Sequence, residues 1–478
     1  MELLNRKNVS ALPKRPIKVV QFGEGNFLRA FVDYAIQLLN LEKDFNAGVA
    51  VVQPIDRGLV SMLNDQDGLY TLFSKGVVSG QEIEEKHLID SIVTAIDPYK
   101  DHQSYLALAQ EATLEFIISN TTEAGIAFDA GDALDMQPPN SFPAKLTQLL
   151  YHRYQFFNGA IDKGLVVIPC ELINYNADTL KEVMLKYIDL WNLDEGFKNW
   201  VLEANSFHNT LVDRIVPGYP KDDIDAYQEQ LAYKDNLIVT SEVFFLWVIE
   251  GGEALKKKLP FAGTKLDVKI VADMQPYRTR KVRILNGAHT SMVPFSLLYG
   301  NETVKQTVDN DFTGRFVKAT IFEEIIPTLD LPKEELEAFA EAVLDRFRNP
   351  FIKHQLASIA LNSISKFKVR VLPSLLAYFE AKGKLPKNLT FAFACLLRFY
   401  KGSWKGEQLP VNDDAVLMDT FKQLWNNLSI EALVQEVLAN TSFWDTDLTK
   451  IPGLKNEVIK ALMLIEEHGV EQGYKAFV

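Results

Sequence analysis

The chain has 478 residues, which is more than one hydrophobic core usually organises, so its length predicts two domains. Hydrophobic residues make up 47% of the chain and charged residues 24%, the proportions of an ordinary globular protein that can bury a full core. The formal net charge of -13 argues against a nucleic-acid-binding surface, because binding to phosphate needs a basic face.

Cysteine and histidine are too sparse to predict a disulfide framework or a metal site. Cys170 and Cys395 lie far apart in the sequence, and the seven histidines are scattered without metal-ligand spacing. The N-terminal residues lack the apolar core of a signal peptide, and no run of about 18 apolar residues occurs. We therefore expect a cytoplasmic protein with no membrane partner.

A glycine turn near the N-terminus predicts a dinucleotide site. The apolar run at residues 17–22 ends in Gly23-Glu24-Gly25, and an amphipathic segment follows to Leu39. Strand, glycine turn and helix in this order are typical of the place where a pyrophosphate meets a helix N-terminus. Leu28 stands where a third glycine is usual, so a purely structural turn remains an alternative. The candidate cofactor-binding residues here are Phe22, Gly23, Gly25, Asn26 and Phe27.

Two further apolar runs extend the predicted parallel sheet. Residues 47–53 read as its second strand, and Asp56 beyond them is placed to bind the ribose of NAD, whereas Arg57 would suit the phosphate of NADP. We favour NAD. Residues 114–119 form another strand that runs into a small polar segment, where an open α/β sheet has its ligand crevice. Thr122 and Glu123 are cofactor candidates there, although a hydrogen-bonded turn also explains them.

The strand predicted at residues 164–171 is followed by Asn174 and Asn176. Either amide could donate to a reacting oxygen together with Asn286, which would give an oxyanion site with two donors. Asparagines that form turns are the alternative.

Residues 278–290 carry the strongest catalytic pattern. If this run is α-helical, Asn286 lies about 140° and His289 about 80° round from Lys281, so the three share a broad face. Neighbouring arginines disfavour a charged lysine, which suits Lys281 to be a general acid or base. An asparagine N–H can hold a developing alkoxide, and a neutral histidine can orient a hydroxyl. A solvated lysine and a satisfied histidine on an amphipathic helix are the alternative.

After residue 272 the β-branched runs give way to segments with helical periodicity, for example 333–348, 377–399 and 414–427. We therefore predict an α/β Rossmann-type domain at residues 1–272 and a mostly α-helical domain at residues 273–478. Basic residues gather at 346–354 and 366–370 in this otherwise acidic chain, where a carboxylate or phosphate would find partners.

Lys281, Asn286 and His289 have the spacing Lys, four residues, Asn, two residues, His, and on this signature the chain resembles the polyol-specific long-chain dehydrogenase/reductase family, also called the mannitol dehydrogenase family. The similarity extends from the Gly23 turn to residues 346–350. It implies a Rossmann-type domain and a helical domain, NAD as cofactor and no metal. It also implies that Lys281 transfers the proton, Asn286 holds the reacting oxygen and His289 binds the substrate.

Residues 21–31 and 169–173 are most similar to the branch of the family that acts on the hexuronate D-tagaturonate. The expected reaction is therefore the reversible reduction of D-tagaturonate to D-altronate. A fructuronate reductase, a mannitol-type polyol dehydrogenase and a non-catalytic dinucleotide-binding regulator are the alternatives. We expect a monomer or homodimer that binds a small sugar acid.

The resemblance also suggests residues for the substrate. Leu172 stands where the mannitol branch has an asparagine, so we favour Asn176 as the second oxyanion donor. Lys366 and Arg370 are candidates for the carboxylate, and Arg278 is a further substrate candidate.

Overall fold

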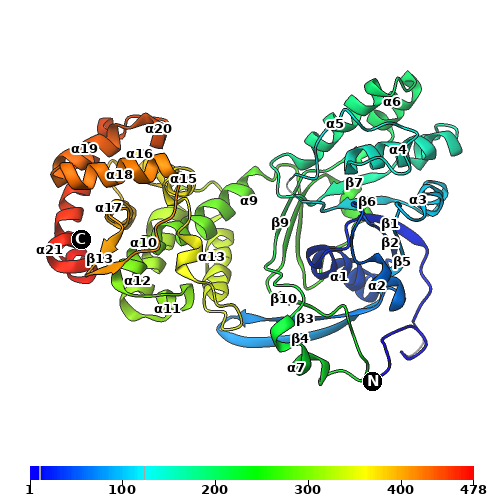
Figure 1. Ribbon diagram of the computed structural model, residues 1–478, viewed down its shortest axis with the longest axis horizontal. Helices are drawn as coiled ribbons and strands as arrows, with labels where there is room; N and C mark the ends of the chain where they lie inside the picture. The colour runs from blue at the N-terminus through cyan, green and yellow to red at the C-terminus, as the bar shows by residue number, and fades with distance from the viewer. Residues whose placement is uncertain (10–11, 123) are drawn as a thin grey trace. The chain divides into compact units, whose positions relative to one another are not determined.

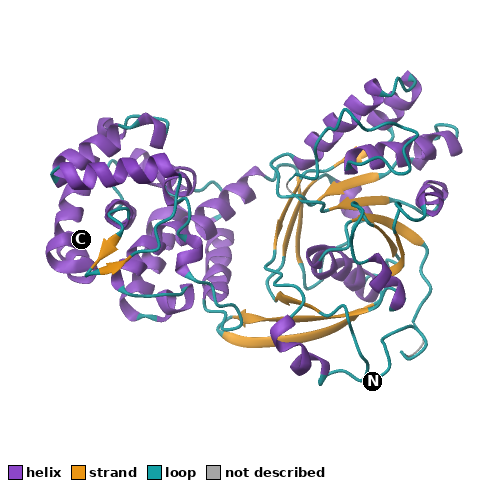
Figure 2. Cartoon of the chain, in the orientation of Figure 1, coloured by secondary structure: helices purple, strands orange, loops and turns teal. Residues whose placement is uncertain are grey.

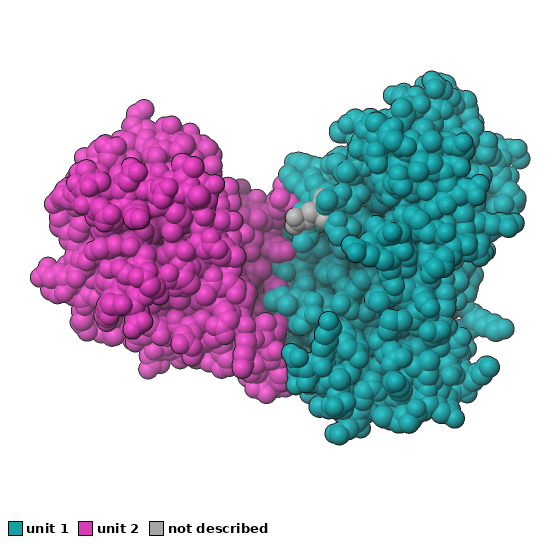
Figure 3. Space-filling model, viewed as in Figure 1, with its two compact units in different colours: residues 1–75, 83–274 teal, residues 76–82, 275–478 magenta. Residues whose placement is uncertain are grey.

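A computed structural model describes residues 1–9, 12–122 and 124–478. The chain forms two compact units, residues 1–75 with 83–274 and residues 76–82 with 275–478 (Figure 3). Glu123, a predicted cofactor residue, lies outside the described residues. Among the residues described, no helix is both long and apolar enough to cross a membrane.

A six-stranded parallel sheet forms the centre of the first unit (Figure 1). The spatial order is β5-β2-β1-β6-β7-β8, which is the 3-2-1-4-5-6 order of a Rossmann fold when these strands are numbered along the chain. The apolar runs predicted as strands at 17–22, 47–53 and 114–119 supply three neighbours in this sheet. Its strands are β1 (Ile17–Phe22), β2 (Gly48–Val52), β5 (Ile92–Ile96), β6 (Phe116–Ser119), β7 (Val166–Pro169) and β8 (Ser206–Phe207).

Helices cover both faces of this sheet. Side chains alternate along a strand, so Val19 packs in the core that includes α1, and Val20 packs in the core on the opposite face. On the first face lie α1 (Asn26–Glu42) and α2 (Val60–Asp65). On the second face lie α3 (His102–Ala107), α4 (Phe142–Phe156), α5 (Asn176–Leu190) and α6 (Glu195–Glu203). The predicted Rossmann-type fold is confirmed.

Two three-stranded sheets complete the first unit (Figure 2). One contains β10 (Val239–Glu242), β3 (Tyr70–Val78) and β4 (Gln81–Ile89); the other contains β12 (Asp267–Val271), β11 (Leu246–Glu250) and β9 (Thr210–Asp213). Two short helices, α7 (Ile224–Gln228) and α8 (Glu253–Lys258), accompany them. The tip of the β3–β4 hairpin, residues 76–82, belongs to the second unit, where the Ser79 N–H donates to the Asp345 carboxylate at 2.7 Å.

The second unit is mostly helical, as predicted. Its first part contains α9 (Gln275–Arg280), η4 (Lys281–Asn286), α10 (Gly287–Tyr299), α11 (Val304–Asp309), α12 (Asp311–Ala319), η5 (Thr320–Ile325) and α13 (Lys333–Phe347). Its second part contains α14 (Leu356–Ile359), α15 (Ser363–Arg370), α16 (Leu372–Lys382), α17 (Lys387–Phe399), α18 (Ala415–Asn427), α19 (Ile430–Ala439), α20 (Thr441–Trp444) and α21 (Leu454–Phe477). A short antiparallel pair, β13 (Ser403–Trp404) with β14 (Glu407–Gln408), lies between α17 and α18.

The continuous helical segment predicted at 377–399 is wrong, because the chain breaks there into α16 and α17. Gly383 ends α16 with a φ of +63°, a conformation that glycine adopts without strain. Pro386 immediately precedes α17 and cannot continue a helical hydrogen-bond ladder. The buried carboxylate of Glu324 satisfies the start of α17 by accepting the backbone N–H groups of Asn388 and Leu389, each at 2.8 Å.

Candidate active site

The glycine turn between β1 and α1 fits a bound pyrophosphate. Gly23 has a φ of +119°, and a Cβ there would lie 2.9 Å from Leu28 and 3.0 Å from the Asn120 carbonyl oxygen, so the position requires glycine. Gly25 caps α1, and within the described chain nothing lies within 4 Å of where its Cβ would be. Among the residues that the structure describes, no side chain caps α1, and no acidic residue occupies its first turn. Open space at an uncapped helix N-terminus suits an anion.

The other predicted residues of this turn have side chains that contact the protein itself. Phe22 is buried and packs against Phe142 with ring centroids 5.0 Å apart. Phe27 stacks on Phe31, also at 5.0 Å. Asn26 accepts a hydrogen bond from the buried guanidinium of Arg29 at 2.7 Å. These three side chains are engaged with the protein, so they would meet a cofactor chiefly through their backbone.

Asp56 lies exposed in the loop after β2. Burial raises the pKa of Tyr99 to about 12, and the negative charge of Asp56 adds to this effect, which places the carboxylate near the phenol. Glu24, from the glycine turn, reaches the same loop and accepts the Leu59 N–H at 3.3 Å. Burial raises the pKa of Glu24. The exposed acid of the loop after β2 therefore lies near a half-buried aromatic ring from the segment that follows β5.

The ends of β6 and β7 are joined by side chains for which the sequence had suggested no role. The Glu171 carboxylate accepts hydrogen bonds from the Ser119 hydroxyl and from the N–H and hydroxyl of Thr121, all at 3.0 Å. Burial raises the pKa of Glu171. Thr122, the described cofactor candidate in this loop, is exposed and has a φ of +116°. An acidic residue directly after a buried strand was the available signal for Glu171.

Asn176, which was favoured as the second oxyanion donor, is enclosed by protein groups that hydrogen-bond to its side chain. It is fully buried at the start of α5, and its amide nitrogen donates to the carbonyl of Pro169 at 2.9 Å and of Glu171 at 3.1 Å. Its oxygen accepts the Thr210 N–H at 3.0 Å. Both amide hydrogens have protein acceptors within reach, so Asn176 has no donor to offer a substrate unless these bonds break.

The run that carries Lys281 and Asn286 is a π-helical turn, η4, between α9 and α10, not the regular α-helix expected. Its hydrogen bonds run from residue i to i+5, so the turn is wider than an α-helical turn. The wider turn brings Lys281 and Asn286, which are five residues apart, closer to the same side. Both are half-buried, and His289 follows in the first turn of α10. Single π-helical turns are frequent at functional sites.

His289 lies in an aromatic and basic environment. Its ring stacks on Phe347 with centroids 4.4 Å apart and meets His354 edge-on at 5.0 Å. Among the described residues, none hydrogen-bonds to its buried Nε2. Burial lowers the pKa of His289 well below its ordinary value, and nearby His354, Arg346, Arg370 and Lys366 lower it further. The imidazole is therefore neutral at physiological pH, and its buried Nε2 has no hydrogen-bond partner among the described residues.

The basic groups around His289 come from two separate segments of the second unit. Lys366 and Arg370 lie on α15, and Arg346 lies near the end of α13. Burial and the charge of Arg370 lower the pKa of Lys366, which shows that these two groups are close. The structure thus brings Lys366 and Arg370 to His289, as well as Arg346 and His354, which the sequence marked only as part of a basic stretch. Arg278 lies half-buried on α9.

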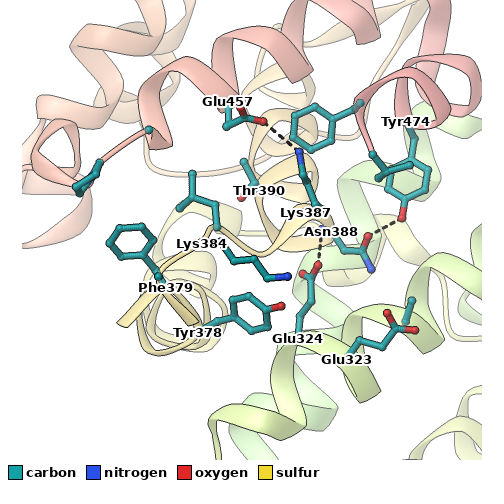
Figure 4. A pocket seen from close by; sticks show the side chains of 17 residues that line it. Glu323, Glu324, Tyr378, Phe379, Lys384, Lys387, Asn388, Thr390, Glu457 and Tyr474 are labelled. Carbon is teal, nitrogen blue, oxygen red and sulfur yellow. Dashed lines mark hydrogen bonds and ion pairs between the residues drawn. The ribbon is translucent and has the colours of Figure 1, made fainter. Parts of the chain in front are cut away.

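A hollow of about 710 Å³ in the second unit lies elsewhere, around Glu324, Lys384 and Tyr474 (Figure 4). No predicted site residue that the structure describes lines it. Across the described part of the chain, no three His, Cys, Asp or Glu side chains are grouped to hold a metal ion.

Both halves of the chain match models of one protein family. Residues 17–263 match the mannitol dehydrogenase Rossmann domain, and residues 273–466 match the mannitol dehydrogenase C-terminal domain. The chain belongs to the mannitol dehydrogenase family. The resemblance predicted from the signature of Lys281, Asn286 and His289 is confirmed, and membership of this family makes the chain an oxidoreductase that acts on CH–OH groups.

Named relatives of this mannitol dehydrogenase family member match along its full length. An altronate oxidoreductase of Yersinia pestis is 48% identical over 483 residues, which cover 100% of both chains. An altronate oxidoreductase of Escherichia coli is 47% identical over 481 residues, 99% of each.

Two solved structures share the fold at lower identity. A D-sorbitol dehydrogenase in substrate-free form has a TM-score of 0.81 and 22% identity, covering 99% of this chain and 100% of its own. The mannitol 2-dehydrogenase of Pseudomonas fluorescens, in a ternary complex with NAD and D-mannitol, has a TM-score of 0.65 and 21% identity over 99% of each chain.

Proposed function

We propose that this oxidoreductase reversibly reduces D-tagaturonate to D-altronate with NADH. Full-length relatives at 47–48% identity are named altronate oxidoreductases, which supports a sugar acid as the substrate. The observation that carries the proposal is the set of basic groups around His289. A sugar acid differs from a polyol in its carboxylate, and Lys366 and Arg370 are the groups that we assign to it.

The proposed proton transfer uses the π-helical turn. The Lys281 ammonium gives a proton to the ketone oxygen as the alcohol forms, and takes it back in the reverse direction. The Asn286 amide donates a hydrogen bond to the same oxygen while negative charge develops on it. The neutral His289 uses its buried Nε2 to hold a neighbouring hydroxyl, which fixes the ketone relative to Lys281.

The glycine turn would hold the cofactor. Gly25 leaves the backbone room to approach a pyrophosphate, Gly23 makes the tight turn before it, and Thr122 lies on the loop beside them. We assign Asp56 to the adenosine ribose, which favours NAD over NADP because a carboxylate would repel a 2′-phosphate. When bound, the nicotinamide supplies the hydride.

The proposal is tested by measuring oxidation of NADH by the purified protein with D-tagaturonate, D-fructuronate and D-fructose in parallel, and again with NADPH. We expect turnover on D-tagaturonate with NADH to exceed that on the other two substrates. Preference for D-fructuronate or D-fructose would overturn the assigned substrate but not the chemistry of Lys281. Binding of NADH without turnover on any sugar acid or polyol would instead identify a regulator.

A further inference from the structure

Glu171 is a buried carboxylate that the proposed reaction does not use. It is 2% exposed and is the second residue after the end of β7. Its three hydrogen-bond donors all belong to the end of β6: the Ser119 hydroxyl on one oxygen, and the Thr121 N–H and hydroxyl on the other. A buried carboxylate with this set of partners fixes the loop after β6 to the end of β7.

The loop that Glu171 holds lies against the glycine turn. The Asn120 N–H donates to the Phe22 carbonyl at 3.2 Å, and the Asn120 carbonyl oxygen is 3.0 Å from where a Cβ of Gly23 would be. Asn120 also donates through its side chain to the Cys170 carbonyl at 2.6 Å. The ends of β1, β6 and β7 are therefore connected through residues 119–121.

The loop also has an unfavourable backbone conformation. Thr122 has a φ of +116°, which is rare for a residue branched at Cβ. Such a conformation persists only where the surroundings enforce it. The two bonds from Thr121 to Glu171 immediately precede it and supply that constraint.

The order of the strands places this loop where a dinucleotide binds. Successive strands are added on one side of β1 up to β5 and on the other side from β6 onward, and ligands of open α/β sheets bind beyond the carboxyl ends of the strands where the strand order reverses in this way. The glycine turn and residues 119–122 are the segments that follow β1 and β6. We propose that Glu171 is a positioning residue for the nicotinamide cofactor, because its carboxylate holds the loop at residues 119–122 in the shape that accepts the dinucleotide.

This inference rests on the proposed dinucleotide site but does not depend on the sugar substrate. It is tested by titrating NADH into Glu171→Ala, Glu171→Gln and the unaltered protein while the fluorescence of the nucleotide is measured. The thermal unfolding of the three proteins is measured as well. Glu171→Ala should weaken NADH binding by about 10-fold or more, because three hydrogen bonds to a charged group are lost. Glu171→Gln should restore most of the affinity, since its amide can accept from Thr121 and donate to the Ser119 hydroxyl.

Asp235→Ala is the matched control. Asp235 is also a buried carboxylate of the first unit, and it accepts the backbone N–H groups of Thr71 at 2.6 Å and Leu237 at 2.8 Å. Its loss should lower the unfolding temperature while NADH affinity stays unchanged. Equal weakening of NADH binding by Asp235→Ala and Glu171→Ala would show that Glu171 is merely structural and overturn the proposal.

Thr121→Val covers the case in which Glu171→Ala does not fold. It removes one donor to Glu171 and keeps the backbone bond, so NADH binding should weaken by about 3-fold. Unchanged NADH affinity in this variant would contradict the proposal. If the unaltered protein binds NADH but reduces no sugar acid, the proposed reaction fails while this test remains decisive.

Discussion

At the scale of single residues, turnover should depend most strongly on Lys281, because it is the group assigned to transfer the proton. Lys281→Ala should lower kcat by about 10²- to 10⁴-fold, the usual contribution of general acid catalysis. NADH affinity should not change, because the glycine turn belongs to the first unit. Lys281→Arg should be nearly as slow, since a guanidinium keeps its proton. Near-normal turnover of Lys281→Ala on D-tagaturonate would contradict the mechanism.

Single substitutions should also separate the binding of the substrate carboxylate from catalysis. Lys366→Ala and Arg370→Ala should each raise the KM for D-tagaturonate by about 10-fold, since a charge-assisted hydrogen bond is lost, and change kcat less. Lys368→Ala is the control, because Lys368 lies on the same helix but pairs with Asp445 at 3.0 Å. If neither Lys366→Ala nor Arg370→Ala raises this KM, the carboxylate is bound elsewhere.

At the scale of elements, the contact between α10 and α15 should set the shape of the substrate site. A Cβ on Gly287, the first residue of α10, would lie 3.0 Å from the carbonyl oxygen of Arg370 at the end of α15. Alanine ordinarily stabilises a helix by up to about 1 kcal/mol relative to glycine. Gly287→Ala should nevertheless lower the unfolding temperature and raise the KM for D-tagaturonate, because α15 and Arg370 must move away from His289.

Gly252→Ala provides the comparison for that variant. Gly252 has a negative φ, and no described atom lies within 4 Å of where its Cβ would be. The unfolding temperature and the KM of Gly252→Ala should therefore stay close to those of the unaltered protein. A higher unfolding temperature for Gly287→Ala with unchanged KM would show that α15 accommodates the methyl group.

The elements that sequence predicts well are those with a strong local pattern. The short, mostly apolar runs at 17–22 and 114–119 indicated buried parallel strands, and the periodicity at 333–348 indicated α13. The break between α16 and α17 was missed because apolar periodicity continues on both sides of Gly383. The π-helical turn was missed because the residue pattern of this run also fits an α-helix, and the sequence does not show where hydrogen bonds from residue i to i+5 replace those to i+4.

The residues of the candidate site likewise divide into those that a local sequence pattern identifies and those whose role depends on the fold. Lys281, Asn286 and His289 could be selected from their spacing within one short run. The role of Glu171 could not be predicted, because it depends on β6 and β7 being neighbours in the sheet. Thr121, which donates to the Glu171 carboxylate, is 50 residues away in the sequence. Asn176 looked like an available donor because the sequence does not reveal that its amide is enclosed by backbone carbonyls and Thr210.

At the scale of the whole molecule, one buried carboxylate in each unit should make stability depend on pH. Burial raises the pKa of Asp33 to about 7, although Gln21 and Tyr70 donate hydrogen bonds to it. Burial likewise raises the pKa of Glu324 to about 7, although it accepts the N–H of Asn388 (Figure 4) and the N–H of Leu389 at the start of α17. Both groups are therefore easier to protonate in the folded chain than at their ordinary pKa values of 3.8 and 4.5.

The sign of the effect follows from proton binding. Between these ordinary values and about pH 7 the folded state holds more protons at Asp33 and Glu324 than the unfolded state does, so their contribution to stability falls as pH rises. Urea unfolding at about pH 5 and about pH 8 should therefore show that each carboxylate contributes roughly 2–3 kcal/mol less stability at the higher pH, a loss that is partly offset by His289, whose lowered pKa acts in the opposite direction. Asp33→Asn and Glu324→Gln should each reduce this loss, because an amide does not titrate. A difference in stability between the two pH values that is the same in both variants as in the unaltered protein would contradict the assignment to these two carboxylates.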